Sequence, residues 1–94
     1  MTATAARLPR PADSVVCRPV ADGAVLLSLE DETYFGLNAA GRIVWEALSV
    51  ADATLNSAVD DLTARFPGVA AETLRADACD LLAELSAHRL VLPV

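Results

Sequence analysis

The sequence holds few side chains that could take part in catalysis or bind a metal. Cys17 and Cys79 lie far apart, no CxxC motif occurs, and His88 is the single histidine. Zinc and redox sites are built from clustered ligands, so this pattern predicts neither. We expect two buried free thiols, with a disulfide or a reactive cysteine as the alternatives, and a surface histidine at a helix end. No catalytic residue, metal or cofactor is predicted.

Two other polar groups are similar to functional sites without matching one. Glu30, Asp31 and Glu32 are consecutive, but adjacent carboxylates on a tight turn point apart and no EF-hand spacing follows, so a solvated turn is predicted. Asp13-Ser14-Val15 resembles the Asp-Ser-Leu attachment site of acyl carrier proteins. That serine begins a helix, whereas Ser14 leads into β-branched residues, which argues against a carrier.

Residues 24 to 48 are the central stretch of the predicted fold, because they contain two strands, an acidic turn and the start of a helix: AVLLSLEDETYFGLNAAGRIVWEAL. Side chains alternate along a strand, so Val25, Leu27 and Leu29 share one fully apolar face, and Ala24, Leu26 and Ser28 share the other. The acidic turn and then residues 33 to 37, which favour extended chain, predict a β-hairpin. Asn38 is the predicted N-cap of a helix that carries the single tryptophan, Trp45.

The rest of the chain predicts a further strand and two further helices. A strand is expected at about residues 14 to 19, joined through Asp22-Gly23 to strands at about 24 to 29 and 33 to 37. Thr54 is the predicted N-cap of a second helix, stopped by Pro67, and a third helix is expected from about 70 to 87. The fold class is therefore α+β and winged-helix-like, a three-stranded antiparallel sheet followed by three helices. We expect a flexible arm over residues 1–13 and one domain over 14–94.

Composition narrows the range of partners. The chain has 94 residues and a net charge of −6, from 13 acidic and 7 basic residues. Phosphate backbones are bound by clustered cationic side chains, so no nucleic-acid partner is expected. No apolar run approaches the roughly 20 residues of a membrane span, and the N-terminus lacks a signal-peptide core, which predicts a cytoplasmic protein with no membrane partner. A basic or neutral peptide suits this charge better.

The third predicted strand is the most informative stretch for binding. In a meander the first and third strands are the edges, and the first is blunted by Pro19. Residues 33 to 37, TYFGL, contain neither proline nor lysine. An extended peptide could pair with this edge and lay alternate side chains toward a neighbouring helix. The alternative, equally supported by composition, is an edge covered by the chain's own tail.

Residues 16 to 92 resemble the PqqD-like family of peptide-binding proteins. The most specific part is Leu37-Asn38, Gly41, Ile43 and Val44-Trp45, and the third helix resembles the family through Asp77, Leu82, Glu84 and Leu85. The chain departs from the family at His88-Arg89-Leu90, where members often have glycine before the leucine.

The resemblance implies a RiPP recognition element, a non-catalytic domain that binds the leader of a ribosomally made precursor peptide. In that family the leader adds as a strand beside the third strand and leans on the third helix. A chain without a fused enzyme is similar to the leader-binding proteins of lasso-peptide pathways, whose partners are a leader peptidase and a cyclase. The expected binding residues are Thr33, Tyr34, Phe35, Gly36, Leu37, Leu74, Asp77, Ala78, Leu81 and Leu82, with Asp77 placed to pair with a basic leader residue.

Two alternatives stay open. Within the family, the partner could be the radical enzyme of pyrroloquinoline quinone biosynthesis. Outside it, a winged-helix DNA-binding protein shares the element set, but it needs a basic recognition helix, and the third helix carries only Arg75 before its end.

Overall fold

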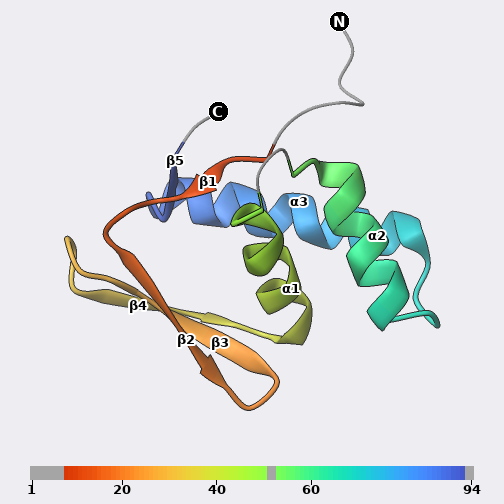
Figure 1. Ribbon diagram of the computed structural model, residues 1–94, viewed down its shortest axis with the longest axis horizontal. Helices are drawn as coiled ribbons and strands as arrows, with labels where there is room; N and C mark the ends of the chain where they lie inside the picture. The colour runs from red at the N-terminus through yellow and green to blue at the C-terminus, as the bar shows by residue number, and fades with distance from the viewer. Residues whose placement is uncertain (1–7, 51–52, 93–94) are drawn as a thin grey trace, which may run out of the picture.

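Three antiparallel strands form the main sheet of the protein. The computed structural model describes residues 8–50 and 53–92 and places β2 at Val15–Val20, β3 at Gly23–Ser28 and β4 at Thr33–Leu37, in the order β2-β3-β4 (Figure 1). The predicted meander is confirmed, with boundaries shifted by one residue in β2 and β3. The β2–β3 connection is the two-residue turn Ala21-Asp22.

The inner face of this sheet is the one that carries Ala24, Leu26 and Ser28. All three are buried, whereas Val25 and Leu27 are half-buried and Leu29 is 58% exposed. The entirely apolar face of β3 therefore lies outside and the mixed face lies against the helices. Ser28 is accommodated there because its hydroxyl accepts from the Asp31 N–H at 3.3 Å, which satisfies a buried polar atom inside the turn.

Three helices follow the sheet: α1 at Ala39–Leu48, α2 at Leu55–Arg65 and α3 at Ala71–Ala87. Both predicted N-caps are confirmed. Asn38 accepts from the Gly41 N–H at 2.8 Å, and Thr54 and Ser57 form a reciprocal capping box. These caps satisfy free N–H groups of the first helical turn and so determine where α1 and α2 begin.

Helix α3 ends in a Schellman motif. Leu90 N–H bonds to the Leu85 carbonyl at 2.9 Å, and Arg89 N–H bonds to the Ser86 carbonyl at 3.1 Å. Arg89 has φ 60, a left-handed conformation that glycine adopts without steric cost. The last turn forms with arginine at the position where the family often has glycine.

A second, two-stranded sheet ties the ends of the described chain together. Strand β1, Arg10–Pro11, pairs with β5, Val91–Leu92, and Leu8 is buried at 8% exposure. Residues 8–13 are therefore attached to the domain, which corrects that part of the expected flexible arm. Residues 1–7, and with them the rest of the expected arm, lie outside the described residues, as do 51–52 and 93–94.

Two groups of buried side chains form the core. The larger joins the inner face of the sheet to all three helices and the β1–β5 pair, and the smaller joins α1, α2 and α3 around Val44, Leu62, Leu74 and Ala78. Trp45 is buried in the larger group. Because all three helices contribute to both groups, the sheet and the helices are held in one relative position (Figure 1).

The expectation of two buried thiols is wrong, since neither cysteine is fully buried. Both cysteines are free, but Cys79 is exposed and Cys17 is half-buried. Cys79 follows the buried Ala78 on α3, and one residue is a turn of about 100° in a helix, which moves its side chain off the apolar stripe.

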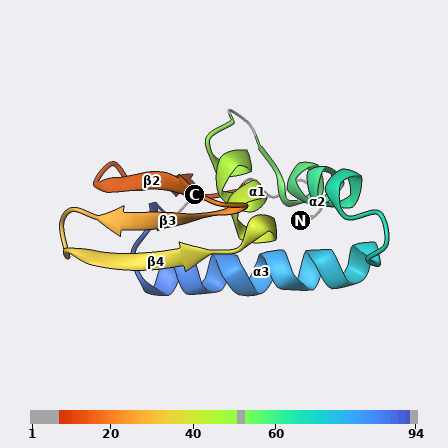
Figure 2. The same cartoon turned by 90° about the horizontal axis from the view of Figure 1, so that it is seen from below.

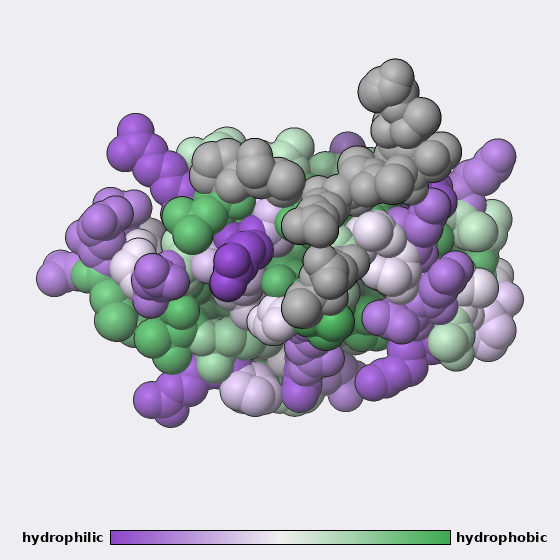
Figure 3. All heavy atoms as spheres, turned by 45° about the horizontal axis from the view of Figure 1, so that its top comes forward, coloured by the Kyte–Doolittle hydropathy of each residue, from purple (hydrophilic) through white to green (hydrophobic). Residues whose placement is uncertain are grey.

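The surface is rich in polar side chains. Hydrophilic residues project around much of the outline in Figure 3, with hydrophobic residues between them. In the described ranges, no helix has the length and apolar character that crossing a membrane requires.

Candidate functional site

Strand β4 is an edge of the main sheet, and its free side faces α3. Figure 2 shows α3 running beside β4 in the opposite direction, with β3 and β2 successively farther away. Among the described residues β4 pairs with β3 alone, and the tail strand β5 pairs with β1 instead. The edge predicted from the sequence is therefore not covered by the described part of the tail.

The hydrogen-bond pattern shows which main-chain groups point to this vacant side. Leu29 N–H donates to the Ser14 carbonyl at 2.8 Å, and these residues are opposite each other in the β2–β3 register. Hydrogen-bonded and non-hydrogen-bonded pairs alternate in an antiparallel ladder. Val25 and Leu27 therefore direct their main-chain groups to β2, and the residues between them direct theirs to β4.

The same alternation continues into β4. In the β3–β4 register, Thr33, Phe35 and Leu37 of β4 lie opposite Ser28, Leu26 and Ala24 of β3. The main-chain groups of the three β4 residues therefore form hydrogen bonds with β3. Tyr34 and Gly36 consequently direct their N–H and C=O groups away from the sheet. No main-chain bond from either residue to another segment occurs within residues 8–50 and 53–92. Two donors and two acceptors are thus left open along one edge.

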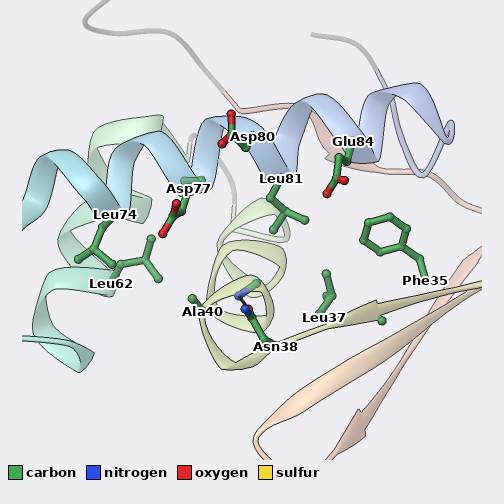
Figure 4. Close-up of a pocket in the computed structure, with 13 residues that line it drawn as sticks. Phe35, Leu37, Asn38, Ala40, Leu62, Leu74, Asp77, Asp80, Leu81 and Glu84 are labelled. Atoms are coloured by element: carbon green, nitrogen blue, oxygen red, sulfur yellow. Dashed lines mark hydrogen bonds between the residues drawn. The ribbon is translucent and has the colours of Figure 1, made fainter. Parts of the chain in front are cut away.

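Between β4 and α3 lies a groove with a volume of about 280 Å³. Figure 4 shows Phe35 and Leu37 from β4 on one side and the side chains of α3 on the other, with Leu62 of α2 and the start of α1 at its base. Leu37, Leu62, Leu74 and Ala78 are buried and form an apolar floor. The complete lining is Phe35, Gly36, Leu37, Asn38, Ala40, Gly41, Leu62, Leu74, Asp77, Ala78, Asp80, Leu81 and Glu84.

Most residues expected to bind a peptide lie around this groove. It is lined by Phe35, Gly36, Leu37, Leu74, Asp77, Ala78 and Leu81. Thr33 and Tyr34 lie on β4 outside it, and the Tyr34 side chain is 75% exposed on the outer face of the sheet. Leu82 does not line the groove; it packs against both core groups, because its place on α3 turns it inward.

The residue-by-residue expectation missed six lining residues, which come from three helices and the β4–α1 junction. They are Asn38, Ala40, Gly41, Leu62, Asp80 and Glu84. Asp80 and Glu84 could have been found from spacing, since positions 77, 80 and 84 share one helix face. Leu62 carried no such signal, because only the packing of α2 under α3 brings it to the groove.

Charge is distributed unevenly in the groove. Its lining contains three carboxylates, Asp77, Asp80 and Glu84, and no lysine, arginine or histidine. All three lie on exposed residues of α3, above the apolar floor. The groove can therefore accommodate apolar side chains on its floor and cationic groups beside the carboxylates of α3. No Cys, Ser or His lines the groove.

Comparison with known proteins identifies the family. Residues 23–91 match the family described as coenzyme PQQ synthesis protein D (PqqD). The chain belongs to the PqqD family. Among solved structures, TbiB1 in complex with the TbiA(beta) leader peptide is similar to this chain, with a TM-score of 0.76, 33% sequence identity, and coverage of 87% of this chain and 93% of that chain. No curated protein matches the sequence significantly.

The PqqD-family resemblance inferred from the sequence is confirmed, and the structure explains its most specific residues. Asn38 caps α1 through the Gly41 N–H, and a Cβ atom on Gly41 would lie 3.3 Å from both Asn38 Oδ1 and Leu37 Cδ2. Glycine at position 41 therefore lets α1 start close against the end of β4. This junction determines how the edge strand and the groove are placed relative to each other.

Proposed function

We propose that this PqqD-family protein is a RiPP recognition element, which binds the leader segment of a ribosomally made precursor peptide by strand addition to β4. The observation that carries the proposal is the outward main chain of Tyr34 and Gly36, open toward α3 across an apolar groove. A guest strand in this position gains main-chain hydrogen bonds from β4.

The groove supplies the selectivity that main-chain bonds lack. Side chains of an extended guest alternate, so every second one points from the sheet toward the helices. Those side chains would enter the space over Leu37, Leu74 and Leu81, while the others face the solvent on the outer side. Burying an apolar side chain there contributes on the order of 1.5–3 kcal/mol. The groove thus favours leaders with apolar residues at alternate positions.

We further propose that the protein itself is non-catalytic and delivers the leader to a peptidase and a cyclase of lasso-peptide biosynthesis. The similarity to TbiB1, whose structure holds a leader peptide, supports leader binding. The second candidate, delivery of a peptide to a radical enzyme in pyrroloquinoline quinone biosynthesis, is favoured by the description of the matching family.

A main-chain test separates strand addition from other modes of binding. The probes are fluorescein-labelled leader halves of short precursors encoded beside this gene, with the TbiA(beta) leader as a reference peptide. Tyr34→Pro removes an outward N–H, whereas Tyr34→Val removes the side chain and keeps that donor. We expect Tyr34→Pro to weaken binding at least tenfold and Tyr34→Val to change it less than threefold, measured by fluorescence anisotropy.

Circular dichroism and Trp45 emission would establish that both variants are folded. Equal affinity of folded Tyr34→Pro and wild type would exclude strand addition at β4. If none of the probes binds, this result would count against leader recognition itself. To separate the two pathways, this protein and the precursor whose leader it binds would be added to each candidate enzyme. Only the correct partner enzyme should process that precursor faster when this protein is present.

A further inference from the structure

The acidic side chains of the groove form a continuous ridge on α3. Asp77, Asp80 and Glu84 are spaced by three and four residues, so they lie on one helix face. Figure 4 shows these side chains along the α3 wall, with Leu81 between them. They stand on the side of the gap that a strand added to β4 would face.

In the part of the chain that the structure describes, no cationic side chain forms an ion pair with this ridge. The ion pair between Arg42 and Glu46 lies within α1, at 3.1 Å. Arg75, on α3 itself, donates to the Asn56 side chain at 2.7 Å. Within residues 8–50 and 53–92, no ion pair involves Asp77, Asp80 or Glu84. Like charges held along one ridge repel one another, and a cationic ligand would relieve that repulsion.

The spacing from Leu81 to Asp77 is close to the spacing of inward side chains in an extended peptide, and the spacing from Leu81 to Glu84 is about 2 Å shorter. Along the helix axis, Leu81 is about 6 Å from Asp77 and about 4.5 Å from Glu84, at 1.5 Å per residue. Successive inward side chains of a strand are about 6.6 Å apart. Because β4 and α3 run alongside each other (Figure 2), a guest between them lies along this ridge.

We propose that the ridge selects leaders in which a lysine or arginine stands two residues from an apolar anchor. The anchor rests on Leu81 and Leu37, and the cation two positions away faces Glu84 on one side or Asp77 on the other. This inference rests on the proposed strand addition at β4 and adds the charge pattern of the ligand. Long cationic side chains suit the position because their aliphatic stems can cover the apolar floor while the charge reaches the exposed carboxylates.

An unbiased selection tests the pattern without knowledge of the natural leader. The probe is a displayed library of random peptides of about 12 residues, long enough for ~40 Å of extended chain. Peptides are kept if they bind wild type and are lost on Tyr34→Pro, which restricts the set to edge-dependent binders. We expect enrichment of lysine or arginine two positions from Leu, Ile or Phe. Edge-dependent peptides without that enrichment would overturn the charge proposal and leave strand addition standing, whereas no edge-dependent peptide at all would overturn both.

Matched charge variants test the same point on the protein. The groove variant Asp77→Asn/Asp80→Asn/Glu84→Gln and the control Asp22→Asn/Asp60→Asn/Asp61→Asn each remove three negative charges, and the control residues do not line the groove. With a lysine-bearing peptide from the selection, we expect about tenfold weaker binding to the groove variant and a less than twofold change for the control. Equal losses would show that net charge alone, and not the ridge, attracts the peptide.

Salt and charge exchange complete the test. Raising salt from about 50 to 500 mM shortens the Debye length and should weaken binding to wild type but hardly to the groove variant. Exchanging the peptide lysine for glutamate should reduce the affinity for wild type. The variant Glu84→Lys should recover part of this lost affinity if the original peptide lysine faces Glu84, and Asp77→Lys should do so if it faces Asp77. Salt-independent binding together with no recovery by either variant would contradict recognition by the ridge.

Discussion

The imidazole ring of His88 lies 5.3 Å from the phenyl ring of Phe35, with the ring planes inclined at 60°. His88 is the C-cap of α3 and Phe35 belongs to β4, so this contact joins the C-terminal end of the helix to the edge strand. Tilted ring pairs at this distance are favourable. The pair therefore helps hold α3 at a fixed distance from the strand that we propose as the docking edge.

Replacing this histidine tests the contact. We expect His88→Ala to lower the free energy of unfolding by less than about 1 kcal/mol, because one ring contact at an exposed position is lost. His88→Phe keeps an aromatic partner and should stay close to wild type. Urea unfolding followed by Trp45 fluorescence measures both, and equal destabilisation of the two variants would show that the ring contact contributes nothing.

Gly23 and Gly36 form a matched pair for testing close packing at the end of β4. A Cβ atom on Gly23 would overlap the Leu37 carbonyl, whereas a Cβ on Gly36 would meet nothing within 4 Å. We expect Gly23→Ala to destabilise the fold by at least ~2 kcal/mol, because backbone must move. Gly36→Ala should be neutral or stabilising by up to ~1 kcal/mol. Thermal unfolding of the two variants decides it, and similar melting temperatures would contradict the packing.

Because Arg89 has a left-handed backbone conformation, we expect a glycine at this position to stabilise the protein. Arg89→Gly should raise the free energy of unfolding by about 1 kcal/mol, since glycine adopts φ 60 without the penalty of a Cβ atom. Ala83→Gly, at an exposed position inside α3, is the control and should cost about 1 kcal/mol. Chemical denaturation gives both values. A loss of stability in Arg89→Gly would mean that the arginine side chain makes a contribution larger than the backbone cost.

The two cysteines should differ in reactivity. Burial raises the pKa of the Cys17 thiol; Arg42 lowers it and Glu46 raises it to lesser degrees. A raised pKa leaves less thiolate at a given pH, so alkylation of Cys17 should be slow until the pH rises or the protein unfolds. Cys79 is exposed and should react first. Mass spectrometry after brief iodoacetamide treatment, with Cys79→Ser as control, follows each site; faster labelling of Cys17 would contradict its burial.

The same pKa shift predicts a small dependence of stability on pH. The folded protein keeps the Cys17 proton to higher pH than the unfolded chain does. The stabilisation is therefore fully present below the thiol pKa of the unfolded chain and is lost as pH rises through the folded value. Urea unfolding at neutral and alkaline pH should show a larger loss in wild type than in Cys17→Ala. Equal losses would assign the alkaline effect to other groups.

The sequence by itself determined the features that depend on near neighbours. Alternation predicted the strands, and Asn38 and Thr54 predicted two helix starts, because a strand face and a cap are decided by side chains within a few residues. The edge position of residues 33 to 37 was predicted too, since they contain none of the residues that block an edge, but composition supported an open edge and one covered by the tail equally. The family resemblance carried by Leu37-Asn38 and Gly41 followed from the same local pattern.

Only the tertiary structure decided which surfaces these elements present to one another. Both faces of β3 are rich in apolar residues, so pattern alone could not show that the face with Ser28 is buried and the face with Leu29 is exposed. The groove is non-local in the same way: it combines β4 with α3 and with Leu62 of α2, and Leu82 is turned into the core instead. Such contacts depend on how distant segments pack, and a periodic sequence pattern does not encode the position of its neighbours.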